Sequence, residues 1–303
     1  MKRTFLMLMC LLMCTTLLFA SCAEDEVKIF SSSGGSGAGK GSASVPTMGN
    51  VSDDTDKNDG KYTKTVALTF DDGPHNTRTK AVVDELDKYG YHATFFVVGN
   101  RVDGTAYGGG EALKYAHEHG NEIGIHGYAH EVYYDTCSDD VFKSELSNTK
   151  KAIKKIIPDA KVTLMRPVGG RITDERVASC EYAVIMWDVD SEDWKHVYAE
   201  GGTPEADEKR DTIVENVMSE VRDGSIILMH DIRQSTVDAT AIILKQLNDE
   251  GYNVVTVSKL LGKKLEAGKK YSRLPNNTET ACADNAREWL YYTTIPSKKQ
   301  ELC

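Results

Sequence analysis

The sequence predicts an α/β fold in which parallel strands alternate with helices. Between about residues 62 and 261, short apolar runs alternate with longer segments whose apolar residues recur at helical spacing. Glycine or proline follows several helical segments, at Gly90, Gly120 and Pro158, where it would end a helix. Repeated βα units of this kind build a parallel sheet with helices packed outside it, and the sheet is either open or closed into a barrel.

Apolar runs predict the strands at residues 66–70, 93–98, 122–125, 162–165, 183–187, 225–229 and 253–257. Helical spacing predicts the helices at residues 82–89, 111–119, 142–156, 213–221 and 237–247. Ser138 is a candidate N-cap for the third of these helices. Thr212 and Glu215 form a candidate capping box for the fourth.

Polar residues cluster just after the predicted strands. In a parallel sheet the carboxyl ends of the strands share one edge, where the chemistry of such folds is placed. The clusters are residues 69–74, 126–130, 166–170, 188–194 and 228–231. Asp71 and Asp72 put two carboxylates side by side, which is costly unless a cation or an arginine separates their charges. His126 and His130 can converge on one metal ion if their segment turns.

The order and residue types of these clusters resemble the polysaccharide deacetylases, which are carbohydrate esterase family four, or the NodB-homology domain. That family carries TFDDGP, H[ST]xxH, RPPYG, DxxDW and LxH, and this chain has TFDDGP, HGYAH, RPVGG, DSEDW and LMH in the same order. The resemblance covers roughly residues 62–261. It implies a deformed (β/α) barrel of about seven strands.

The resemblance implies a divalent metal site formed by Asp72, His126 and His130. One carboxylate and two imidazoles suit Zn²⁺, with Co²⁺, Mn²⁺ or Ni²⁺ as alternatives. Three protein ligands leave open positions for water and substrate, as a catalytic site requires.

The resemblance also implies four catalytic residues. Asp71 would be the general base that deprotonates the attacking water, and Arg166 would hold Asp71 ionised and oriented. His230 would be the general acid that protonates the departing amine, and Asp193 would tune that histidine.

The remaining motif residues are expected to bind the substrate. Trp194 and Leu228 would wall the pocket for the acetyl methyl group, and the backbone N–H of Gly169 would stabilise the oxyanion together with the metal. Two motifs depart from the family pattern. Gly169 replaces a tyrosine and Val168 a proline, so the groove loses an aromatic wall, and Gly127 replaces a serine or threonine, which removes a hydroxyl near the metal.

The implied activity is metal-dependent N-deacetylation of an N-acetylated glycan with release of acetate. Peptidoglycan, with its N-acetylglucosamine and N-acetylmuramic acid residues, is the favoured polymer, and chitin-like oligomers are also open. The alternatives are an O-acetyl xylan esterase, a glycan-binding surface lipoprotein without turnover, and an amidase for small cyclic imides or amides. The formal net charge of −10 argues against a nucleic-acid partner. The sequence leaves the oligomeric state open.

The N-terminal segment predicts export. Residues 1–21 combine Lys2 and Arg3 with a short apolar run, as in a signal peptide, although an uncut membrane anchor is the alternative. Ala20 and Ser21 before Cys22 resemble a lipobox, which would place a lipid on Cys22; cleavage after Ala23 would instead give a secreted protein. Residues 22–60 are Gly/Ser-rich and then polar, as in a flexible tether. The expected location is the outer face of a bacterial cell membrane, with the catalytic domain at 61–261.

Four cysteines remain after removal of the signal peptide and lipidation of Cys22. Pairing of Cys137 with Cys180 and of Cys282 with Cys303 is the most local of the three possible connectivities, and free thiols are the alternative. Residues 262–303 form a C-terminal tail that would pack on the barrel or extend the sugar groove.

Overall fold

A nine-stranded sheet organises the chain in the computed structural model, which describes residues 61–104 and 109–275. The strands are β1 (Lys64–Asp71), β2 (Thr94–Val97), β3 (Glu122–Ile125), β4 (Leu164–Met165), β5 (Ala183–Ile185), β6 (Val189–Asp190), β7 (Ile226–His230), β8 (Tyr252–Val254) and β9 (Lys270–Tyr271). Their order is β6-β7-β1-β2-β3-β4-β5-β9, and β8 pairs with the beginning of β1. All of these pairings are parallel.

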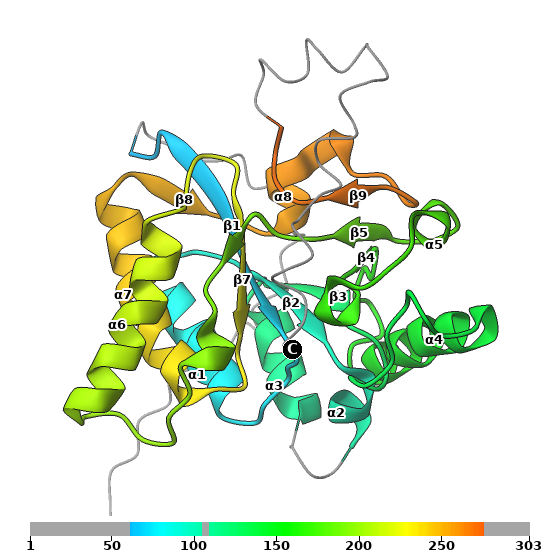
Figure 1. Cartoon of the computed structure of the whole chain (residues 1–303), viewed down its shortest axis with the longest axis horizontal. Helices are drawn as coiled ribbons and strands as arrows, with labels where there is room; N and C mark the ends of the chain where they lie inside the picture. The colour runs from blue at the N-terminus through cyan, green and yellow to red at the C-terminus, as the bar shows by residue number, and fades with distance from the viewer. Residues whose placement is uncertain (1–60, 105–108, 276–303) are drawn as a thin grey trace, which may run out of the picture. The chain divides into compact units, whose positions relative to one another are not determined.

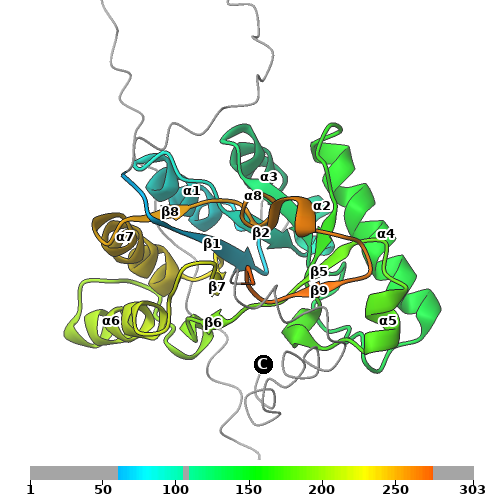
Figure 2. The same cartoon turned by 90° about the horizontal axis from the view of Figure 1, so that it is seen from above.

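Helices cover the outer side of the curled sheet (Figures 1 and 2). They are α1 (Arg78–Asp87), α2 (Gly99–Asp103), α3 (Gly109–Glu118), α4 (Asp139–Ile156), α5 (Asp174–Ala178), α6 (Pro204–Met218), α7 (Gln234–Asp249) and α8 (Val257–Leu261). Short 3₁₀ turns occur at Val168–Gly170, Asp193–Lys195 and Gly262–Lys264. The predicted α/β barrel-type fold is therefore confirmed.

The central strands of the sheet are buried on both faces, which explains why they appear as continuous apolar runs. Val66, Leu68 and Phe70 of β1 belong to the larger apolar core, and Ala67 belongs to a second core on the other face, which also contains Phe96. Successive strand residues point to opposite faces, so both faces of β1 are packed.

Two predictions about helix starts have different outcomes. The Ser138 cap of α4 is confirmed, because its hydroxyl accepts a hydrogen bond from the backbone N–H of Val141. The capping box at Thr212 is wrong: α6 already begins at Pro204, and Thr203 is its N-cap, accepting from the backbone N–H of Ala206 at 3.1 Å. Charged residues fill the first two turns of α6, so its apolar spacing begins only late in the helix.

The predicted disulfide between Cys137 and Cys180 is wrong, because both residues are free thiols. Cys180 is buried in the larger core, while the Cys137 sulfur lies 3.1 Å from a guanidinium nitrogen of Arg176. Cys282 and Cys303 lie outside the described residues, as do the predicted signal peptide, Cys22 and the tether. None of the helices in the described ranges has the length and apolar character that a membrane crossing requires.

Candidate active site

The carboxyl ends of the central strands bring most of the predicted site residues to one edge of the sheet. In the parallel register of β1 and β7, Asp71 lies opposite His230 and Thr69 opposite Leu228. His126 directly follows β3, and Arg166 directly follows the neighbouring β4. Asp71 and His230 end their strands, and His126 and Arg166 directly follow theirs, so strand register sets their positions.

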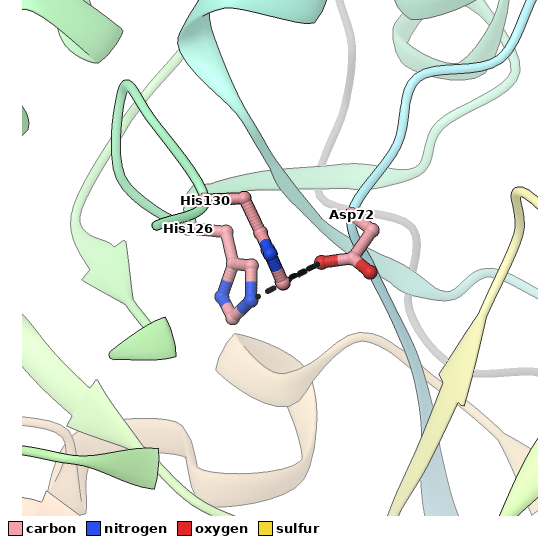
Figure 3. Close-up of side chains that lie close together, drawn as sticks. All are labelled: Asp72, His126 and His130. Carbon is pink, nitrogen blue, oxygen red and sulfur yellow. Dashed lines mark ion pairs between the residues drawn. The ribbon is translucent and has the colours of Figure 1, made fainter. Parts of the chain in front are cut away.

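Asp72, His126 and His130 form a compact group of candidate metal ligands (Figure 3). Oδ1 of Asp72 lies 2.9 Å from Nε2 of His130 and 3.5 Å from Nε2 of His126. One ligand atom from each residue lies within 4.8 Å of the other two. Asp72 and His126 are buried and His130 is partly exposed, so solvent reaches the group from the His130 side. This donor set fits a divalent ion such as Zn²⁺.

Burial and neighbouring charges have opposite effects on the pKa of Asp72. Burial favours the neutral carboxyl and would raise its pKa, but the His130 hydrogen bond and the charges of His230 and His126 outweigh that effect and lower the pKa. Asp72 has a positive φ of 70°, and its carbonyl oxygen accepts a hydrogen bond from Arg101 at 2.7 Å. Asp72 is therefore held ionised in a backbone conformation that few residues other than glycine adopt.

A buried carboxylate on α4 fixes the turn that carries the two histidines. Oε2 of Glu145 accepts hydrogen bonds from the backbone N–H groups of Tyr128 at 2.7 Å and Ala129 at 2.8 Å. Nδ1 of His126 lies 3.0 Å from the carbonyl oxygen of Arg166, so a proton on Nδ1 leaves Nε2 available for a metal. Sequence reasoning missed Glu145, although an acidic residue on the apolar face of the predicted helix was the available signal.

Arg166 binds Asp71 inside the protein. Its fully buried guanidinium donates to Oδ1 of Asp71 and to the Thr69 hydroxyl, each at 2.8 Å. It also donates to the carbonyl oxygens of Ile185 at 3.1 Å and Met186 at 3.0 Å. Burial lowers the pKa of Arg166, while the Asp71 charge opposes that shift. A buried charge pair with these additional partners holds the Asp71 carboxylate in one orientation.

Asp193 and His230 form a second charged pair. Oδ1 of Asp193 lies 2.7 Å from Nδ1 of His230, and Oδ2 accepts from the His230 backbone N–H at 2.8 Å and the Thr236 hydroxyl at 2.5 Å. Burial alone would lower the pKa of His230, but the Asp193 charge and hydrogen bond raise it to about 10. Burial likewise opposes the ionised form of Asp193, but the charge of His230 overrides it and lowers the pKa of Asp193. His230 is therefore held protonated at neutral pH.

The predicted substrate-contact residues lie within three positions of members of these pairs in sequence. Leu228 lies two residues before His230 on β7 and therefore on the same face of that strand. Trp194 follows Asp193 and is partly exposed. Gly169 adopts a positive φ of 58° in the turn after β4.

Asp231 is a second residue that sequence reasoning did not assign. Its carboxyl is fully buried and accepts a hydrogen bond from the Thr79 hydroxyl, and burial raises its pKa to about 7. A Cβ atom on Gly73 would lie 2.5 Å from Oδ1 of Asp231, so the turn after Asp72 can pass this carboxyl only with glycine at that position. Asp231 therefore lies directly against the turn that follows the two site aspartates.

A curled parallel sheet with an Asp-His-His group and two charged pairs at its carboxyl edge is the architecture expected of the polysaccharide deacetylases. The family model for polysaccharide deacetylase matches residues 58–185. A peptidoglycan-N-acetylglucosamine deacetylase of Bacillus cereus is 35% identical over 206 residues, which cover 65% of this chain and 88% of that protein. The chain belongs to the polysaccharide deacetylase family.

Two further similarities describe the range of the family. The peptidoglycan-N-acetylmuramic acid deacetylase PdaC of Bacillus subtilis is 40% identical over 197 residues, or 65% of this chain, but the match spans only 38% of PdaC. A family 4 acetyl xylan esterase of Clostridium thermocellum, solved with a cobalt ion, has a TM-score of 0.61 and 28% identity. That match covers 70% of this chain and 100% of the esterase.

Proposed function

We propose that the protein is a metal-dependent deacetylase of an N-acetylated glycan, with peptidoglycan as the favoured polymer. One observation carries this proposal: the candidate metal ligands lie at the same edge of the sheet as two charged pairs. The ligands are Asp72, His126 and His130, and the pairs are Asp71–Arg166 and Asp193–His230. The names of the relatives support the substrate class, because one is described as acting on N-acetylglucosamine and another on N-acetylmuramic acid in peptidoglycan.

The arrangement supplies a base and an acid on separate side chains. A divalent ion held by Asp72, His126 and His130 would polarise the acetyl carbonyl and lower the pKa of the attacking water. Asp71, which the Arg166 guanidinium holds in place at 2.8 Å, accepts the proton of that water.

His230 then donates its proton to the amine nitrogen as the C–N bond breaks, and Asp193 keeps the ring oriented and charged until that step. The backbone N–H of Gly169 donates to the tetrahedral oxyanion, and Trp194 and Leu228 enclose the methyl group. The products are acetate and the free amino sugar.

The second candidate activity is O-deacetylation of xylan. The similarity to an acetyl xylan esterase favours it, and the same residues could perform it because an alkoxide leaves more easily than an amine. Retention of Asp71, Asp72, His126, His130 and His230 argues against a purely glycan-binding role.

Acetate release from N-acetylglucosamine oligomers, peptidoglycan and acetylated xylan tests the proposal. Release that stops with chelator and returns with Zn²⁺ or Co²⁺ is the expected result, with faster turnover on the N-acetylated substrates. The Asp71→Asn variant should lose roughly 10³-fold in kcat while it keeps its metal, and His126→Ala should lose the metal. Faster turnover of xylan would favour the esterase, and a fully active Asp71→Asn variant would refute the assigned base.

We also propose that Cys22 anchors the protein to the outer face of a bacterial membrane through a lipid. The lipobox-like residues before Cys22 motivate this, together with the Gly/Ser-rich tether that follows. In cells, the Cys22→Ala variant should move from the membrane fraction to the soluble fraction. Equal membrane association of both forms would contradict lipidation.

A further inference from the structure

The segment of residues 131–138, between His130 and α4, contacts both motif glycines that differ from the family pattern. A Cβ atom on Gly127 would lie 2.8 Å from the hydroxyl oxygen of Tyr134. A Cβ atom on Gly169 would lie 3.6 Å from Cε1 of Tyr133. Two consecutive tyrosines therefore lie beside the two positions where side chains of the family motifs are missing.

Tyr134 anchors this segment in the protein. Its side chain is fully buried and packs edge-on against Phe142, with ring centroids 5.0 Å apart and planes at 71°. Its backbone N–H donates to the carbonyl oxygen of Arg171 at 3.1 Å, and its carbonyl oxygen accepts from the Arg176 guanidinium. The backbone of Tyr133 is therefore held by its neighbour.

The Tyr133 side chain differs from that of Tyr134 because it is only partly buried. The guanidinium carbon of Arg171 lies over its ring, 4.2 Å from the centroid. Nε of Arg171 donates to Oδ2 of Asp135 at 2.9 Å, which fixes the guanidinium in turn. Both of these charged side chains are about one-third exposed, at 35% and 32%. Tyr133 is thus a preorganised aromatic ring that solvent still reaches.

This ring lies beside one part of the candidate active site, the Gly169 turn. Tyr133 follows the candidate ligand His130 by three residues, and its edge faces the Gly169 turn, whose backbone is the proposed oxyanion donor. Aromatic rings pack favourably against the apolar C–H face of a pyranose ring, and rigid rings do so at little cost in conformational entropy. Arg171 adds hydrogen-bond donors beside the ring.

We propose that Tyr133 and Arg171 form a sugar-binding subsite beside the Gly169 turn. It receives a pyranose residue next to the one that loses its acetyl group and supplies the aromatic wall that Gly169 lacks. This inference rests on the proposed glycan deacetylase function.

The test compares Tyr133→Ala with the unaltered protein, each as the full chain loaded with Zn²⁺. On the N-acetylglucosamine tetramer, KM should rise about tenfold with kcat within about twofold, and on 4-nitrophenyl acetate, which has no sugar, neither constant should change. Tyr133→Phe keeps the ring and should retain the original KM. Tyr115→Ala on α3, whose hydroxyl binds Asp84, is the matched control and should leave KM unchanged. Arg171→Gln should also raise KM.

Calorimetric binding of the same tetramer separates this inference from the proposed function. Weaker binding by Tyr133→Ala with an unchanged metal content supports the subsite, whether or not the unaltered protein turns the tetramer over. Equal tetramer affinity in the two proteins would overturn the subsite, even if deacetylation is established. Equal losses on the tetramer and on 4-nitrophenyl acetate would assign Tyr133 a structural role and also overturn it.

Discussion

Individual residues of the site are ionised where burial opposes ionisation, and each is held by a specific partner. Arg166 is fully buried, yet it donates to Asp71, Thr69 and two main-chain carbonyl oxygens. His230 keeps its proton because Asp193 lies 2.7 Å away. Removing one partner of such a pair leaves the other charge buried and unpaired. The free-energy cost is therefore larger than that of losing one hydrogen bond.

The Asp193→Asn variant should shift the pH dependence of catalysis. Without the Asp193 charge, the pKa of His230 falls from about 10. His230, the proposed general acid, then loses its proton at lower pH, so the alkaline limb of the kcat profile moves to lower pH and kcat at neutral pH falls about 100-fold. Steady-state rates of acetate release between pH 6 and about pH 10 measure this.

The same pair should contribute to stability with a defined sign. Because the folded protein raises the pKa of His230, the contribution is complete below the ordinary histidine pKa of about 6.5 and is lost as pH rises through about 10.

Thr236→Val, which keeps the carboxylate of Asp193 and removes one hydrogen bond to it, is the control for the kinetic prediction and should shift the rate profile less. An unchanged alkaline limb in Asp193→Asn would show that Asp193 does not set the proton affinity of His230.

Among the elements, the sequence predicts the strands that a local apolar pattern marks, and it misses the strands that form only by pairing with a distant segment. The buried strands β1, β2, β3 and β7 are apolar runs, so pattern alone locates them. The strands β6 and β9 each consist of one apolar and one charged residue, so no apolar run marks them.

The same distinction applies to the site. Motif residues such as Asp72 and His126 are recognisable because they follow strands in a fixed order. Glu145 acts through main-chain N–H groups 16 and 17 residues away in sequence, and spacing cannot reveal that contact. The unpaired Cys137 and Cys180 show the same limit, because the number of cysteines does not indicate the distance between them.

Helix α4 should control metal affinity through Glu145. Glu145→Ala removes the acceptor of two main-chain hydrogen bonds and frees the turn between His126 and His130, so Zn²⁺ affinity should fall about 10- to 100-fold. Competition with a chromogenic chelator measures this affinity. Glu145→Gln keeps an acceptor oxygen and should lose less, while Asp140→Ala, in the exposed first turn of the same helix, should leave it unchanged. Equal Zn²⁺ affinity in Glu145→Ala and the unaltered protein would refute this role.

Across the described residues as a whole, the segment after α8 connects two distant parts of the sheet. β9 pairs with β5 at one edge, where the backbone N–H of Met186 donates to the Tyr271 carbonyl at 2.7 Å. A few residues later, Arg273 forms an antiparallel bridge with Ser225, directly before β7. Leu265, Tyr271 and Leu274 also pack against the second core. Residues beyond 261, predicted as a C-terminal tail that packs on the barrel or extends the sugar groove, thus take part in the sheet as far as the structure describes them.

Truncation should therefore distinguish two ends of the domain, at residues 261 and 275, that differ by 14 residues. A chain of residues 61–261 loses the partial burial of three large side chains, about 1 kcal/mol each, and exposes β5 as an unpaired edge. Compared with residues 61–275, its midpoint of thermal unfolding should fall by roughly 10 °C, and it should aggregate more readily.

Calorimetry and light scattering of the two fragments at equal concentration test this expectation. Tyr271→Ala in the longer fragment retains the main-chain pairing and should produce only part of the loss, because the strand then covers β5 without its largest side chain. Equal midpoints for 61–261 and 61–275 would show that the sheet is stable without β9. The segment would then be an addition to the fold rather than a part of it.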